Sequence, residues 1–535
     1  MTNPPFSGQI VAKHSAEVNA LSLEIAKMEP GVPAAKDENA QSALPTPIAL
    51  VPFEVLAAIF QACIPEIASL STICSGISSR RHPSILLSHV CNTWRTTAIA
   101  SPPLWSEMYI TVPAHTDPSP EAGAEWLEQM KRLRKAVDVW STRSGNSLLR
   151  IRLTSNATHY GTGQSGDTTR DVLDSLVGAI QKAASRWREV AFLLMVGSSW
   201  ELGMVELLQV PPETFPHLKR VELNIYSESF GMDGQFHTLH HMLASPGLLS
   251  TPSIRFLKLH GMWGDTSSQA ITKHWPPLVS LDIDAFQPAG SNPTPVQSAS
   301  QLIRLLNSLP TLTNVVFFIQ GKSSRGDFLQ LPAGDLPQAP RLRTLTLKGA
   351  EVPKGFTRSI NLPALQDIHF QFTSLIPEGV ESGIVECILQ LGTQLKSLTF
   401  SPDAVNRHAL VKILESLPAL ETLTLNPQGS GSHFRCSADR PGLTETLTND
   451  RPGLDPDTLR CPRLRQLKLR TSRDRYKDDA VEQALVELIA RRRGRSWGSG
   501  GFQLQERGPD TPDLLQELKD WDVDLHGFDL RLTYL

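Results

Sequence analysis

The sequence lacks long hydrophobic runs. Its longest uninterrupted apolar segment, Val190 to Val196, has seven residues, whereas a membrane-spanning helix needs about 20. Residues 1–30 contain no apolar stretch of the kind found in a secretory signal peptide. We therefore expect neither a membrane span nor secretion, and we predict an intracellular protein that is cytoplasmic, nuclear or both.

Cysteine, aromatic residues and net charge are also scarce. The 535 residues include six cysteines without regular spacing, which predicts reduced thiols rather than a disulfide framework. Aromatic residues make up 6% of the chain, and the formal net charge is −3. A protein that binds nucleic acid through its overall charge is strongly basic, so we expect no nucleic-acid partner.

Leucine, by contrast, is abundant. It accounts for 72 of the 535 residues, and hydrophobic residues make up 40%, enough to build a folded core. From residue 146 onward a motif recurs, often as Pro, one residue, then apolar-x-x-apolar-x-apolar. Its first apolar residue falls at positions 148, 187, 218, 254, 278, 312, 342, 365, 395, 420 and 464, with a mean spacing of about 32 residues. Such self-similarity is typical of repeat proteins.

Helical patterns lie between these motifs, for example at residues 172–180, 302–309 and 410–417. Each unit therefore reads as a short strand followed by a helix, which can bury its apolar face only by stacking on its neighbours. The pattern predicts an α/β solenoid, an irregular leucine-rich-repeat horseshoe with strands on the concave side. The alternative is a doubly wound α/β domain, which favours longer Val- and Ile-rich strands.

The changes in pattern along the chain divide it into five segments. We expect a short N-terminal helix and linker at 1–45, a small helical domain at 46–110 and a linker helix at 111–145. The repeat array occupies 146–475, and a C-terminal helix and cap occupy 476–535. Within the cap, Trp521, Val523 and Leu525 alternate with polar residues, which predicts a final strand.

Two short motifs mark the helical domain: Val51-Pro-Phe-Glu-Val-Leu-Ala-Ala-Ile-Phe60 and Val90-Cys-Asn-Thr-Trp-Arg95. They resemble the two halves of an F-box, Leu-Pro-x-Glu-(Ile/Val)-Leu-x-x-Ile-Phe and Val-Cys-(Arg/Lys)-x-Trp-Arg. Ser101-Pro-Pro-Leu-Trp105 resembles the segment after the box in the large F-box families of mushroom-forming fungi, where irregular leucine-rich repeats follow. The departures are Val51 for Leu, Asn92 for a basic residue, and a long insert from Cys63 to Pro83.

This resemblance implies a substrate-recognition subunit of a Skp-cullin-F-box ubiquitin ligase, without catalysis or a cofactor of its own. The box would dock a Skp-type adaptor, and through it a cullin, with Pro52, Val55, Leu56, Ile59, Phe60, Val90, Cys91 and Trp94. A region this small carries more apolar residues than it can bury internally. The alternative is that these helices only cap the repeats, in an adaptor-independent leucine-rich-repeat scaffold or binding protein.

The repeats would hold a protein substrate. Side chains alternate between the two faces of a strand, so the residue between the last two apolar positions of each motif points away from the core. These predicted substrate-binding residues are Glu222, Lys258, Asp282, Val316, Thr346, His369, Thr399, Thr424 and Lys468. Acidic residues lie mainly in the earlier repeats and basic ones in the later repeats, which predicts an electrically graded surface.

Four further patterns resemble chemical motifs without their full requirements. Gly161–Gly166 matches G-x-G-x-x-G but lacks the strand directly before it, and His237 and His241 are spaced for zinc but have too few companions. Cys63, Cys74, His89 and Cys91 do not converge on one helix face, and the basic run at 490–495 suits a helix end. We interpret all four as structural and expect no catalytic residue and no metal site.

Overall fold

The computed structural model describes residues 51–64, 76–77, 79, 82–113, 119–155, 166–196, 207–227, 247–261, 274–284, 299–319, 336–349, 352–372, 383–401, 405, 407–425, 461–470, 501–505 and 529–533. The chain divides into two compact units, one ending at Leu56 and the other beginning at Ala57. Of the first unit the structure describes residues 51–56. The second unit contains every strand described below.

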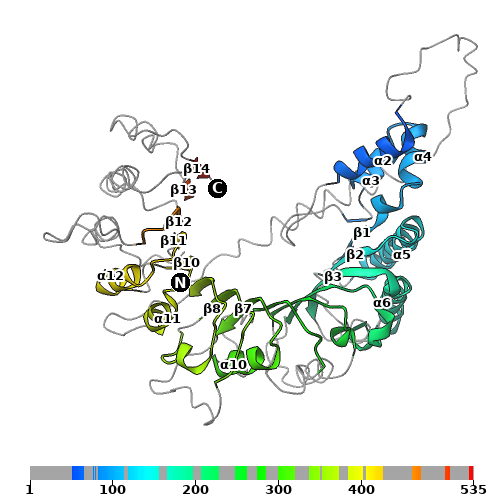
Figure 1. Ribbon diagram of the computed structural model, residues 1–535. Coiled ribbons are helices and arrows are strands. Elements are labelled where there is room, and N and C mark those ends of the chain that lie inside the picture. The colour runs from blue at the N-terminus through cyan, green and yellow to red at the C-terminus, as the bar shows by residue number, and fades with distance from the viewer. Residues whose placement is uncertain are drawn as a thin grey trace, which may run out of the picture. The chain divides into compact units, whose positions relative to one another are not determined.

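All described strands belong to one parallel sheet whose strand order follows the chain from β1 to β14 (Figure 1). They are β1 (Glu107–Val112), β2 (Leu149–Ser155), β3 (Trp187–Val196), β4 (Arg220–Ser227), β5 (Phe256–Gly261), β6 (Ser280–Asp284), β7 (Asn314–Ile319), β8 (Thr344–Gly349), β9 (Asp367–Phe372), β10 (Ser397–Phe400), β11 (Thr422–Leu425), β12 (Gln466–Arg470), β13 (Gly501–Gln505) and β14 (Asp529–Thr533). The order never reverses, and β1 and β14 are its two edges. A doubly wound sheet reverses its strand order at a switch point, so that alternative is wrong.

The described helices that connect the strands lie along one face of the sheet (Figure 1). They are α5 (Pro120–Arg143), α6 (Gly166–Gln181), α10 (Ala299–Ser308), α11 (Gly383–Leu391) and α12 (Arg407–Glu415). Short 3-10 turns stand in several other connections: η2 (Pro102–Trp105), η3 (Ala184–Arg186), η4 (Pro212–Thr214), η5 (Leu248–Ser250) and η6 (Thr357–Ser359). An open parallel sheet with helices on one side is an α/β arrangement compatible with a solenoid.

The recurring Pro in the sequence motif forms a turn before the strand. In seven described units the residue before the Pro accepts a hydrogen bond from the backbone N–H three positions later: Leu218 to Phe215, Ile254 to Thr251, Leu312 to Leu309, Leu342 to Ala339, Leu365 to Leu362, Leu420 to Leu417 and Leu464 to Cys461. Pro is favoured at the second position of such a turn because its φ is already fixed. Each donating residue is at most 2% exposed, so the turn delivers an apolar side chain to the core.

A second backbone pattern links each unit to the next. The carbonyl of Lys219 accepts hydrogen bonds from the N–H groups of Arg255 and Phe256, and that of Arg255 accepts from Val279 and Ser280. The same pair of hydrogen bonds to one carbonyl recurs at every junction from β4 to β12. The predicted motifs thus fall on eleven consecutive strands, β2 to β12, and stability is built from nearest-neighbour contacts.

Before the repeats, the first box motif forms α2 (Phe53–Ala62), which begins directly after Pro52. Residues 83–99 form two helices, α3 (Pro83–Ser88) and α4 (Asn92–Ile99), rather than the single helix that the pattern of residues 85–100 predicts; the second motif begins between them and continues into α4. The break has a physical cause. Cys91 has an extended backbone (φ −156°, ψ 174°) and is the N-cap of α4, so helix geometry cannot run through it.

Strand β1 lies within residues 107–112, outside the predicted array, and pairs with β2 over its whole length. Strands β13 and β14 extend the sheet into the predicted cap. The expected strand at residues 521–525 lies outside the described residues, as do the helical stripe at 11–28, Gly161–Ser165, the histidines at 237–241 and the basic run at 490–495.

Two sequence expectations concern the membrane and the thiols. No helix in the described ranges has the length and apolar character that a membrane crossing requires. The four cysteines that the structure describes are free thiols: Cys63 and Cys91 are exposed, and Cys387 and Cys461 are buried. Burial raises the pKa of the Cys387 thiol, so this side chain stays protonated and acts as a small apolar core residue.

Candidate functional site

One row of residues crosses the whole sheet in register, one residue from each strand; we call it the central row. It consists of Tyr109, Arg152, Ala191, Glu222, Lys258, Asp282, Val316, Thr346, His369, Thr399, Thr424, Lys468, Gln503 and Arg531. The nine predicted substrate-binding residues are nine consecutive members of this row. Their placement side by side is confirmed, and their role in binding stays a prediction.

Three acidic side chains of this surface lie close to basic side chains on other strands. Glu222 Oε1 lies 2.7 Å from Lys258 Nζ on the next strand, and Asp284 Oδ2 lies 2.9 Å from Lys348 Nζ. Asp282 Oδ1 lies 3.3 Å from His260 Nε2. Opposite charges therefore lie side by side across strands, and the predicted gradient from acid to base along the sheet stays a prediction.

The later strands carry hydroxyl groups in place of charges. Thr346 and Thr399 are each 7% exposed, and His369 Nδ1 lies 2.7 Å from Thr399 Oγ1. Burial lowers the pKa of His369, with Asp367 opposing the shift, so this imidazole is neutral at physiological pH. The central row is thus charged in its first half, on β2 and β4–β6, and again at Lys468 on β12 and Arg531 on β14.

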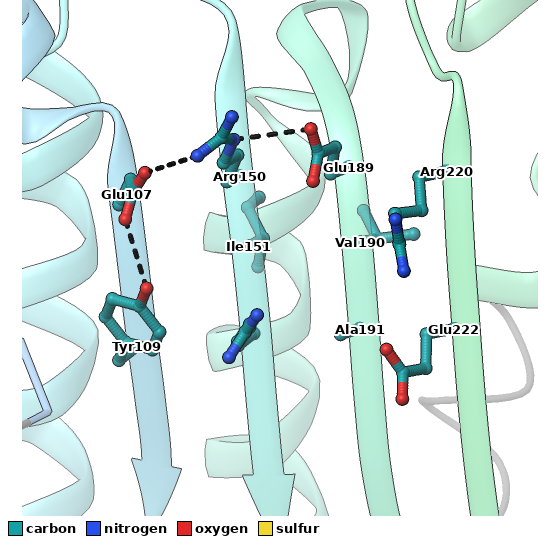
Figure 2. Close-up of a pocket in the computed structure, with 10 residues that line it drawn as sticks. Glu107, Tyr109, Arg150, Ile151, Glu189, Val190, Ala191, Arg220 and Glu222 are labelled. Atoms are coloured by element: carbon teal, nitrogen blue, oxygen red, sulfur yellow. Dashed lines mark hydrogen bonds and ion pairs between the residues drawn. The ribbon is translucent and has the colours of Figure 1, made fainter. Parts of the chain in front are cut away.

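A small hollow opens on that charged half, over Ala191 (Figure 2). Its volume is about 60 Å³, several times the ~10–15 Å³ that one water molecule needs. Long side chains surround the single methyl group of Ala191, because its register partners on β2 and β4 are Arg152 and Glu222. The remaining walls come from the row two residues earlier: Glu107, Arg150, Glu189 and Arg220.

Each carboxylate of this hollow has a basic side chain nearby. Arg150 donates to Glu107 at 2.8 Å and lies 3.3 Å from Glu189 (Figure 2), while Glu222 is paired with Lys258. Two guanidinium groups pack against aromatic rings: Arg152 lies 5.6 Å from the ring centre of Tyr109, and Arg220 lies 5.8 Å from that of Phe256. Sequence reasoning missed the hollow, because Ala191 lies in an apolar run that gives no sign of a binding surface.

The predicted adaptor-binding residues divide by exposure. Pro52, Val55, Ile59, Val90 and Cys91 are exposed, and the three apolar ones among them, at 55, 59 and 90, expose 49%, 47% and 60%. Leu56 and Phe60 are buried at 2% and 0%, and the half-buried Trp94 has its ring centre 4.9 Å from that of Phe60. These three therefore support the helices, and the exposed five are the ones that a partner can reach.

Further exposed apolar side chains lie in the same stretch. Phe53, Leu86 and Ile99 are 45%, 53% and 40% exposed, so six of the eleven large apolar residues exposed in the described chain fall between residues 53 and 99. Exposed apolar side chains that gather in one region mark interaction surfaces more often than scattered ones do. Helical periodicity could have indicated Leu86, since it lies four residues before Val90.

A buried aromatic cluster joins α3 to α5, and sequence reasoning missed it. His82, the N-cap of α3, packs edge-on against Trp140 with ring centres 4.6 Å apart, and Trp105 packs against the same ring at 4.8 Å. The guanidinium of Arg143 covers Trp105 at 4.4 Å, and Ser84 Oγ donates to the carbonyl of Leu104 at 2.7 Å. Residues 82–105 are thus packed against α5, the helix that precedes the predicted repeat array.

Metal chemistry finds no support in the described residues. No three His, Cys, Asp or Glu side chains among them come together in an arrangement that could hold a metal ion. Cys74, one of the four residues considered for such a site, lies outside the described ranges.

Comparison with known proteins adds no relative. No protein-family model matches the chain, and no curated protein matches it.

Proposed function

We propose that the protein is the substrate-recognition subunit of a Skp-cullin-F-box type ubiquitin ligase, working in the cytoplasm, the nucleus or both. The observation that carries the proposal is the gathering of exposed apolar side chains between residues 53 and 99. Four of the six, Phe53, Val55, Ile59 and Val90, lie in the two motifs that resemble an F-box. Burying such side chains against an adaptor would stabilise the complex by about 25 cal/mol per Å² of apolar surface.

The repeat sheet would supply the substrate surface. The central row and its neighbours place charged, hydroxyl and small side chains in adjacent positions along one face, which gives a partner many separate contacts. No residue of the proposed mechanism is catalytic. The protein would act by holding a substrate near an enzyme that the adaptor and cullin bring.

The test is adaptor capture by the full-length chain. Ile59→Asp with Val90→Asp places charges on two exposed apolar positions, and we expect binding of a purified Skp-type adaptor to fall at least about tenfold. Leu389→Asp is the matched control, because Leu389 is 41% exposed on α11, far along the sequence from the box. Equal binding by wild type and the double variant, with circular dichroism unchanged, would contradict the proposal.

A second candidate function is an adaptor-independent leucine-rich-repeat scaffold or binding protein. The aromatic cluster around Trp140 favours it, because contacts from His82 and Trp105 are what a helical cap on a repeat array needs. The same assay separates the two: a wild-type chain that binds its substrate and no Skp-type adaptor supports the scaffold.

A further inference from the structure

We infer that a row of basic side chains at the starts of strands β3 to β12 binds an acidic, extended segment of the protein substrate. The inference rests on the proposed function, since it takes the repeats as the substrate-binding part of the chain. It concerns residues outside the central row, at the end of the sheet where every strand begins.

The first step is the alignment of these residues, which we call the entry row. Each member directly follows the first apolar position of its motif. A backbone hydrogen bond of 2.8–2.9 Å runs from the N–H of each member to the carbonyl of the member before it. The ten members are therefore neighbours in space: Arg188, Lys219, Arg255, Val279, Thr313, Arg343, Gln366, Lys396, Glu421 and Arg465.

The second step is the charge of the entry row. Six of its ten members are Arg or Lys, and one, Glu421, is acidic. Arg341 and Arg463 add two more exposed cations, each two residues before a member of the row. The whole chain carries a formal net charge of −3, so this row concentrates cations on a protein that is not basic overall.

The third step is that these cations are available to a ligand. Arg188 lies 3.9 Å from Glu189, and Arg255 donates to the carbonyls of Pro252 and Ile254 at 2.9 Å each, which fixes its guanidinium without neutralising it. Within the part of the chain that the structure describes, the other four cationic members are exposed and form no ion pair: Lys219, Arg343, Lys396 and Arg465.

Two carboxylates follow the entry row by one residue, and both have partners of their own. Glu189 Oε1 lies 3.3 Å from Arg150 Nε. Asp367 Oδ2 accepts a 3.3 Å hydrogen bond from Thr344 Oγ1. The cations of the row outnumber these acids, so this end of the sheet has positive charge to offer to the carboxylates of a partner.

The fourth step is the choice of ligand. The row crosses ten strands in single file, about 43 Å at about 4.8 Å per strand, and an extended peptide of about 13 residues covers that length at about 3.3 Å per residue. Proteins that bind single-stranded nucleic acid add aromatic side chains on which the bases stack, and the entry row contains none. An acidic protein segment needs only the cations, so the row favours that ligand.

The test uses the full-length chain and three fluorescein-labelled ligands: fourteen-residue peptides of alternating Glu-Ala and of alternating Gln-Ala, and a fourteen-nucleotide thymidine strand. Fluorescence anisotropy should show that the Glu-Ala peptide binds at least about tenfold more tightly than the other two. This binding should weaken between about 0.1 M and about 1 M salt, where the screening length falls from about 10 Å to about 3 Å. No binding of the Glu-Ala peptide, or equal or tighter binding of either other ligand, would overturn the inference.

Paired variants locate the site. Arg343→Gln with Lys396→Gln removes two cations of the entry row, and binding of the Glu-Ala peptide should weaken at least about tenfold. Arg304→Gln with Lys412→Gln is the matched control, because it removes the same charges from exposed positions on α10 and α12. An equal loss in the control would overturn the inference, since overall charge alone would then attract the peptide.

A further variant should bind more tightly than wild type. Glu421→Gln removes the one acid of the entry row, and the affinity for the Glu-Ala peptide should rise about twofold or more, the effect of one exposed charge. A gain of affinity cannot come from misfolding. Unchanged or weaker binding by this variant would contradict the inference.

Adaptor capture keeps this inference separate from the proposed function. Arg343→Gln with Lys396→Gln should bind a Skp-type adaptor as wild type does, while Ile59→Asp with Val90→Asp should still bind the Glu-Ala peptide. Failure of the wild type to bind the adaptor would reject the ligase proposal and leave peptide binding as an independent result. Failure to bind the peptide, with adaptor capture intact, would reject the inference alone.

Discussion

Lys348 on β8 reaches across the whole of β7 to place its Nζ 2.9 Å from Asp284 Oδ2 on β6. Both side chains are about three-quarters buried, with 24% and 25% exposure. Asp282 lies on the same strand and the same face as Asp284, so Lys348 also balances a local excess of negative charge.

The first prediction is that Lys348→Met destabilises β6–β8 by about 1 kcal/mol, because the mostly buried carboxylate of Asp284 then loses its ion-pair partner. Hydrogen exchange of peptides from these three strands measures the effect locally, which suits a repeat array. Adding Asp284→Asn should recover most of the loss. If the double variant loses as much stability as the two single variants added together, the two residues do not interact.

The second prediction concerns acid. Burial lowers the pKa of His82 to about 4, below the unfolded value of about 6.5, so the folded protein prefers the neutral imidazole. The contribution of His82 to stability is complete above pH ~6.5 and is lost as the pH falls towards 4, by about 3 kcal/mol at most. His82→Asn keeps a capping side chain and removes the titration. Its thermal midpoint should depend less on pH between 7 and 4.5 than that of wild type; parallel pH profiles would contradict this assignment.

The third prediction compares two glycines. Gly261 ends β5 with φ +106°, and a Cβ there would collide with the carbonyl oxygen of Ile225 on β4. Gly261→Ala should therefore cost about 1–3 kcal/mol. Gly178 lies in α6 with open space beside it, so Gly178→Ala should stabilise by about 0.5–1 kcal/mol. Thermal denaturation of both variants tests the pair, and shifts of the same sign would contradict it.

The fourth prediction concerns the end of α5. Arg186 donates hydrogen bonds to Ser144 Oγ at 2.9 Å and to the carbonyls of Ser141 at 3.0 Å and Gly145, so it caps that helix from the next repeat. Arg186→Met should lower the free energy of unfolding by about 1 kcal/mol, because the carbonyls at the end of α5 lose their donor. Faster hydrogen exchange at residues 136–143 is the readout. Arg188→Met, at an exposed neighbouring position, should leave that exchange unchanged.

The sequence predicts the repeat well because each motif contains the residues that form its turn and its strand. Pro418 fixes a turn, Leu420 enters the core, and the two apolar residues that follow alternate with a surface residue, so strand and orientation can both be read from eight residues. Strand β1 was missed although Met108, Ile110 and Val112 alternate with polar residues and Pro102-Pro-Leu104 forms the same turn before it, because Ser101–Trp105 was assigned to the segment that follows the box.

The site depends on relations that no single motif contains. The pairing of Lys348 with Asp284 skips a strand, and the hollow over Ala191 requires the register of β1–β4. Burial of Leu56 and Phe60 could not be separated from the exposure of Val55 and Ile59 by hydrophobicity alone. That distinction depends on which side of α2 is covered.

The regular strand spacing of the central row limits which residues of a bound peptide can contact it. Parallel strands lie about 4.8 Å apart, and an extended peptide advances about 3.3 Å per residue, so the two spacings coincide only when three residues span two strands. Side chains of an extended peptide alternate between its two faces, so a peptide lying along the row would place the same kind of contact at every sixth residue, about four strands further on. Its specificity would then have a period of six in its own sequence, and inserting a single residue would turn all later side chains to the opposite face.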